Sequence, residues 1–146
     1  MLFLACLFLL QSPEPQAPAP TPGWSATTFE AASTDANKKV LAEARPLTVT
    51  GEVVDVSCYT QLGKRGEGHK ACGAMCVATG SPAGLLTADG TLYVLMPEPH
   101  HPRRDGKASL AKYLSERMAQ TLTLSGMAST HGGIHTLFIP VPAGAK

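Results

Sequence analysis

The sequence has few charged and few aromatic side chains, and its charges nearly balance. Charged residues make up 16% of the 146 positions and aromatic residues 5%, and the formal net charge is +1 at pH 7. Proteins that bind nucleic acid through its phosphates carry a strongly basic surface. Two short basic clusters, at 64–70 and 103–107, do not outweigh this balance. We therefore expect no nucleic-acid partner and no general attraction to anionic membranes.

The sequence also lacks the signatures of common catalytic sites. It contains no hydrolase nucleophile motif, no phosphate-binding loop and no evident pair of catalytic carboxylates. Glu52 and Asp55 lie on opposite sides of a predicted strand, and we interpret them as charges at a sheet edge. The Cys-x-x-Cys-His motif of attached haem and the Cys-x-x-Cys motif of thiol-redox proteins do not occur. These absences favour a binding protein over an enzyme.

No apolar run is long enough to cross a membrane as a helix, which takes about 20 residues. Residues 1–11 form a shorter apolar segment, of the length found in the core of a secretory signal. Prolines then recur through residues 12–23, a composition typical of an extended spacer. We expect an exported protein, periplasmic or extracellular, with an envelope protein as its macromolecular partner. Membrane contact would be limited to segment 1–11, if that segment stays attached.

The remainder divides into a polar lead-in at 24–45, a β-rich domain at 46–140 and a tail at 141–146. The lead-in is rich in alanine and polar residues, which leaves it either disordered or a short helix capped by Asp35. In the domain, residues 47–56 read as a first strand. Adjacent apolar residues there break the period of two, which predicts a bulge or bend near Gly51.

Turn signals divide the rest of the domain into two strand pairs and a helix. Asp89-Gly90, between apolar runs, predicts a hairpin. Apolar spacing predicts a helix from about 107 to 118, and strands at 120–128 and 134–139 form the last pair. Strand, insert, strand, strand, helix, strand, strand is the element order of an OB-fold. We therefore predict a mainly β protein: a five-stranded OB-like barrel with a Cys-bearing helical insert between strands 1 and 2. An open five-stranded roll is the alternative.

The insert contains the residues with metal-binding chemistry, Cys58, His69, Cys72 and Cys76. If residues 69–79 form a helix, His69, Cys72 and Cys76 share one face. Strand parity places Cys58 on the side where that helix would pack. Three thiols and one imidazole match a Cys₃His site for a zinc or copper ion. The sequence thus predicts a metal ion as partner, held by these four residues in a structural or metal-handling role.

The cysteines also allow a disulfide, or a redox-active pair formed by Cys72 and Cys76. Export would bring the thiols into an oxidising compartment, where cysteines usually pair. With Cys6 in the targeting segment, three cysteines remain, which is an odd number. Cys72 and Cys76 are four residues apart on a predicted helix and do not easily reach disulfide geometry. A bridge from Cys58 to one of them would make the domain a disulfide-stapled ligand-binding or protein-interaction module without catalysis.

The other four histidines occur in pairs outside the insert. His100 and His101 lie in a proline-rich loop, and His131 and His135 flank a predicted turn. We interpret both pairs as solvent-exposed side chains.

Several motifs of the domain form a recognisable set. They are Gly51-Glu52-Val53-Val54-Asp55, Cys58-Tyr59, Gly68-His69, Cys72-Gly73-Ala74-Met75-Cys76 and the run from Gly80 to Tyr93. Together they resemble small exported bacterial OB-like proteins of uncharacterised function, over about residues 46–140. The resemblance implies an OB-like fold, export and a Cys/His cluster as the defining feature. It implies no activity.

Overall fold

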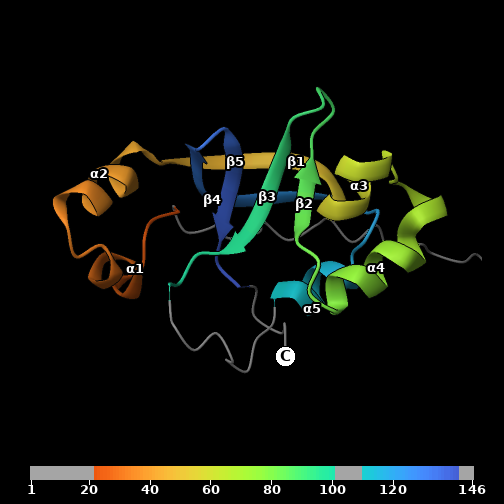
Figure 1. Cartoon of the computed structure of the whole chain (residues 1–146), viewed down its shortest axis with the longest axis horizontal. Coiled ribbons are helices and arrows are strands. Elements are labelled where there is room, and N and C mark those ends of the chain that lie inside the picture. Colours follow the sequence, from red (N-terminus) through yellow and green to blue (C-terminus); the bar gives the residue numbers. More distant parts are fainter. Residues whose placement is uncertain (1–21, 101–109, 142–146) are drawn as a thin grey trace, which may run out of the picture.

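The computed structural model describes residues 22–100 and 110–141, and its centre is a closed five-stranded barrel (Figure 1). Neighbouring strands follow the order β1-β2-β3-β5-β4. The pairs are antiparallel except β3 and β5, which run parallel. This topology confirms the predicted mainly β, OB-like barrel. The strands are β1 (Arg45–Asp55), β2 (Ala83–Leu86), β3 (Leu92–Pro97), β4 (Thr121–His131) and β5 (Ile134–Ile139).

The long strand β1 closes the barrel by pairing with two neighbours. Residues from Arg45 to Glu52 pair with β4, and residues from Glu52 to Asp55 pair with β2. The change of partner falls beside Gly51, where we expected a bulge or bend. A Cβ atom at this position would lie 2.6 Å from the Leu86 carbonyl oxygen. Glycine is therefore required because the backbones of β1 and β2 approach closely here.

Both predicted turns are confirmed. In the β2–β3 hairpin the Thr87 N–H donates to the Thr91 carbonyl at 3.0 Å, and Gly90 adopts a positive φ of 88°. Gly132 and Gly133, with φ of 59° and 80°, join β4 to β5. Glycine reaches these left-handed conformations without steric cost, which explains why both turns were readable from the sequence.

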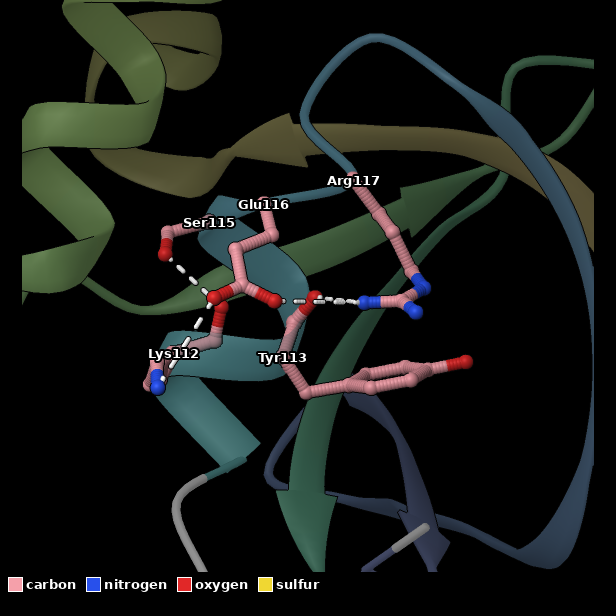
Figure 2. Close-up of polar contacts among 5 residues, drawn as sticks. All are labelled: Lys112, Tyr113, Ser115, Glu116 and Arg117. Carbon is pink, nitrogen blue, oxygen red and sulfur yellow. Dashed lines mark hydrogen bonds and ion pairs between the residues drawn. The ribbon is translucent and has the colours of Figure 1, made fainter. Parts of the chain in front are cut away.

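Helix α5 (Leu110–Ser115) packs on the barrel core but ends earlier than the predicted Met118. The Glu116 N–H still donates to the Lys112 carbonyl at 3.1 Å, but the Arg117 N–H turns to the Leu114 carbonyl at 3.0 Å, and side chains bond the carbonyls of the last turn (Figure 2). The Ser115 hydroxyl donates to the Lys112 carbonyl at 2.8 Å, and Arg117 Nη1 donates to the Tyr113 carbonyl at 3.0 Å. The Arg117 guanidinium also lies 3.8 Å from the Tyr113 ring centroid. The Arg117 side chain thus occupies the Tyr113 carbonyl, to which the Arg117 N–H would donate in a continuing helix, and the helix ends there.

The lead-in forms two helices, α1 (Ala26–Ala31) and α2 (Asp35–Glu43), rather than one. Thr34, not Asp35, is the N-cap of α2, and its side chain accepts from the Asn37 N–H at 3.2 Å. Trp24 packs edge-on against Phe138 of β5, with ring centroids 5.3 Å apart. The buried Glu98 carboxylate accepts from the Ser25 N–H at 2.6 Å. These contacts attach the lead-in to the barrel.

Figure 1 shows the lead-in helices at one end of the barrel and the helices of the insert at the other. None of the helices in the described ranges has both the length and the apolar character needed to cross a membrane. Segment 1–11, most of the spacer 12–23 and nearly all of the tail 141–146 lie outside the described residues.

Replacing Gly51 with alanine should lower the free energy of unfolding by about 3 kcal/mol, because the new Cβ would collide with backbone atoms of β2. Urea unfolding monitored by circular dichroism measures this loss. Gly68→Ala is the matched control, since nothing lies within 4 Å of a Cβ there. Its effect should stay within about 0.5 kcal/mol. Equal stability of the two variants would contradict the close approach of β1 and β2.

Candidate metal centre

The insert between β1 and β2 is helical from its first residue. It contains α3 (Val56–Leu62), the 3₁₀ turn η1 (Glu67–His69) and α4 (Lys70–Ala78). Asp55 ends β1 and is the N-cap of α3, since its carboxylate accepts from the Ser57 N–H at 3.0 Å. Cys58 therefore lies on α3, and the strand parity by which we placed it was wrong. The chain changes from strand to helix two residues before Cys58.

Glu52 of β1 holds the loop that leads to His69. Its carboxylate accepts from the Gly66 N–H at 2.6 Å and lies 3.7 Å from Arg65 Nη1. The Glu52 side chain is only partly exposed. It therefore connects the barrel to the insert and is not a solvent-exposed charge at the sheet edge, as we had interpreted it. This contact fixes the segment immediately before η1.

His69 is 7% exposed and lies at the start of α4. Gly73, one turn further along, makes room for it. A Cβ atom at Gly73 would lie 3.3 Å from His69 Cδ2 and 3.1 Å from Met118 Sδ. The missing side chain lets α4 pack closely on both groups, which holds the imidazole against the barrel.

Asp55, Cys58 and His69 form a cluster at metal-binding distance. Each offers one ligand atom, and these atoms all lie within 4.8 Å of one another. The three residues come from β1, α3 and η1, so segments separated along the chain meet here. Carboxylate oxygen, thiolate sulfur and imidazole nitrogen are all established zinc ligands. Within residues 22–100 and 110–141, no other set of three such side chains meets this closely.

Two buried atoms of this cluster, Asp55 Oδ2 and His69 Nε2, have no hydrogen-bond partner among the described residues. An unsatisfied buried polar atom costs about 1–3 kcal/mol. The other carboxylate oxygen, Asp55 Oδ1, accepts from the Ser57 N–H and, at 2.5 Å, from the Ser81 hydroxyl. A cation between the two unpaired atoms would satisfy both of them.

The other two predicted ligands, Cys72 and Cys76, lie on α4 beside this cluster. Cys76 is half-buried, and its thiol interacts with Cys72 and with Asp55. Cys72 is exposed. All three cysteines of the insert are free thiols. The structure thus brings Cys58 and His69 into one close cluster and places Cys72 and Cys76 at its border.

The Asp55 carboxylate sets the protonation of the neighbouring thiols. Burial acts to raise the pKa of Asp55, but hydrogen bonds from Ser81, Cys58 and Ser57 outweigh it and lower that pKa. Hydrogen bonding to Asp55, then burial, then the Asp55 charge raise the pKa of Cys58 to about 11. Burial, followed by the charges nearby, also raises the pKa of Cys76. Both thiols therefore keep their protons until a cation displaces them.

Asp55 is the site residue that we missed in the sequence, where we interpreted it as an edge charge. It is 0% exposed. The available signal was the N-cap pattern, an aspartate followed by helix-compatible residues. We overlooked it because Val53, Val54 and Val56 favoured a strand that continued further.

The remaining histidines lie away from the cluster. His100, His131 and His135 are exposed, as expected, and His101 lies outside the described residues. The Nδ1 atom of His135 lies 2.9 Å from the Thr130 hydroxyl.

Replacing Ser81 with alanine should lower the free energy of unfolding by about 2 kcal/mol, because the buried Asp55 carboxylate would lose a hydrogen bond. Ser57→Ala is the matched control, since it keeps the backbone N–H that caps Asp55 and removes only an exposed contact between the Ser57 and Ser81 hydroxyls. Its cost should stay below about 0.5 kcal/mol. Urea unfolding in the presence of a chelator compares the two, and equal losses would contradict the role assigned to Ser81.

Comparisons with protein-family models, with curated proteins and with solved structures found no match to this chain. Its function therefore has to be argued from the chemistry of this cluster.

Proposed function

We propose that this protein binds one zinc ion through Asp55, Cys58, His69 and Cys76. The observation that carries the proposal is the pair of buried atoms without partners, Asp55 Oδ2 and His69 Nε2. Both belong to a cluster of three potential ligands. Buried polar atoms are normally paired, so two unpaired atoms in the same cluster favour a common cation as their partner.

Zinc in a structural site takes four ligands in tetrahedral geometry. Cys76 is the best fourth ligand because it is half-buried and its thiol interacts with both Asp55 and Cys58. Zinc–ligand bonds of about 2.0–2.3 Å place tetrahedral ligand atoms roughly 3.3–3.8 Å apart. The cluster lies within 4.8 Å, so small side-chain movements bring it to this geometry.

The ligand chemistry favours zinc over copper. Copper(I) prefers thiolates and thioethers, whereas zinc also accepts carboxylate oxygen. Asp55 contributes such an oxygen at the centre of the cluster. The set predicted from spacing alone, with Cys72 in place of Asp55, suits either metal. The buried carboxylate is thus what supports zinc.

The ion would hold the insert to the barrel. Asp55 lies at the end of β1, Cys58 on α3 and Cys76 on α4, so one ion joins three elements. Four protein ligands leave no open coordination position, which fits a binding role without catalysis. The export expected from segment 1–11 is part of the proposal. In an oxidising compartment, a bound ion would protect these thiols from pairing.

The purified full-length chain, reduced and stripped of metal, should take up about one zinc ion at this site and melt at a higher temperature with zinc. Asp55→Asn and His69→Gln should each weaken zinc binding by about a hundredfold. Competition with a chelator of known zinc affinity measures this change. His131→Gln, an exposed histidine at the end of β4, is the matched control and should bind zinc like the unmodified chain.

Equal zinc affinity in the unmodified chain and in His69→Gln would contradict the proposed site. Thiol counts after denaturation test the alternative, a domain stapled by a disulfide. Loss of two thiol equivalents from the isolated protein, together with no zinc uptake after reduction, would favour the disulfide.

A further inference from the structure

We propose that Cys72 is the entry ligand of this site, the thiol that captures the ion at the surface and passes it to the buried ligands. This inference rests on the proposed zinc site and concerns how the ion reaches and leaves it. Cys72 would not be a ligand of the loaded site, because Asp55, Cys58, His69 and Cys76 already complete a tetrahedral set.

Burial increases stepwise from Cys72 towards the centre of the cluster. Cys72 is exposed, Cys76 and Cys58 are half-buried, and His69 and Asp55 are 7% and 0% exposed. Cys72 and Cys76 are one turn apart on α4 and lie on the same side of the helix. Their thiols interact with each other, and both interact with Cys58. The three thiols thus lie between solvent and the buried ligands, in order of increasing burial.

The side of the cluster towards β1 and the loop before η1 leaves no open approach. Glu52, Arg65, Gly66 and Met118 border a space beside Asp55 and His69 that is too narrow for a water molecule. The hydrogen bond from Gly66 to Glu52 holds this wall in place. A zinc ion, which arrives with water or a carrier ligand, therefore has its open approach along the thiol side.

Transfer along this path is a series of ligand exchanges. Cys72 gives up its proton and forms a bond to zinc as one bond to the carrier breaks. Cys58 and Cys76 then lose their protons to water and bind the ion together with Asp55 and His69, as the remaining bonds to the carrier break and the carrier leaves. The bond to Cys72 breaks in this step, and that thiol regains a proton. Because Cys72 is bound neither at the start nor at the end, its removal should slow both loading and release and leave the equilibrium affinity unchanged.

The test is the rate of zinc transfer from its complex with the coloured chelator 4-(2-pyridylazo)resorcinol, followed by absorbance, and the rate of zinc removal by EDTA. Cys72→Ser should slow both processes about tenfold, since a tethered thiol at the surface raises the effective ligand concentration. Its equilibrium affinity should stay unchanged. Cys72→His keeps a ligating nitrogen and should restore the rates. Melting curves check that the variants are folded, which the exposure of Cys72 favours.

Three results would overturn the inference. Unchanged transfer rates in Cys72→Ser would remove Cys72 from the path while the zinc site stands. A loss of affinity as large as that of Cys58→Ser would make Cys72 a ligand of the loaded site. No zinc binding in the unmodified chain would overturn the zinc site itself, and the entry ligand with it.

Discussion

The buried carboxylate of Asp55 is the constraint on which the arrangement of the insert depends. It ends β1, caps α3 and accepts a hydrogen bond from Ser81, two residues before β2. A buried charge is tolerated only where polar groups compensate it. The protein compensates one of its oxygens and leaves the other without a partner, in the same cluster as His69. The same residue therefore joins the structure of the barrel to the chemistry of the site.

Barrel geometry explains why ligands far apart in the sequence meet at this point. The end of β1 pairs with the start of β2, with Asp55 opposite Ala83. Both ends of the insert are consequently held side by side. The Ser81 N–H also donates to the Cys76 carbonyl at 2.9 Å, which ties the end of α4 to the same place. The insert is thus a closed loop whose base is the candidate metal centre.

The parts of the structure that depend on local signals were predictable from the sequence. The hairpin at Asp89-Gly90 and the turn at Gly132-Gly133 need a residue with positive φ. A glycine between two apolar runs is the sequence signal for such a turn. The barrel order followed from these turns. The position where β1 becomes α3 was not predictable in this way, because the apolar run through Val56 suits either element. Because this boundary was misplaced, we predicted Cys58 to follow the strand, whereas it lies on α3. For the same reason we did not identify Asp55 as the N-cap of α3.

Tertiary contacts decided the other differences. The lead-in is helical and attached because Trp24 reaches Phe138 and Ser25 reaches Glu98, contacts between segments about 70 or more residues apart. No local pattern contains that information. The same applies to the site: spacing indicated Cys58 and His69, whereas the part played by Asp55 becomes visible only when its burial and its unpaired oxygen are known.

X-ray absorption at the zinc edge of the loaded protein tests the central claim most directly, because it reports the atoms bound to the ion. The account predicts two sulfur atoms at about 2.3 Å and two nitrogen or oxygen atoms at about 2.0–2.1 Å. Replacement of Asp55 by asparagine should alter the oxygen contribution and leave the sulfur distances. A first shell of oxygen and nitrogen alone, or one with three sulfur atoms and no oxygen, would contradict it.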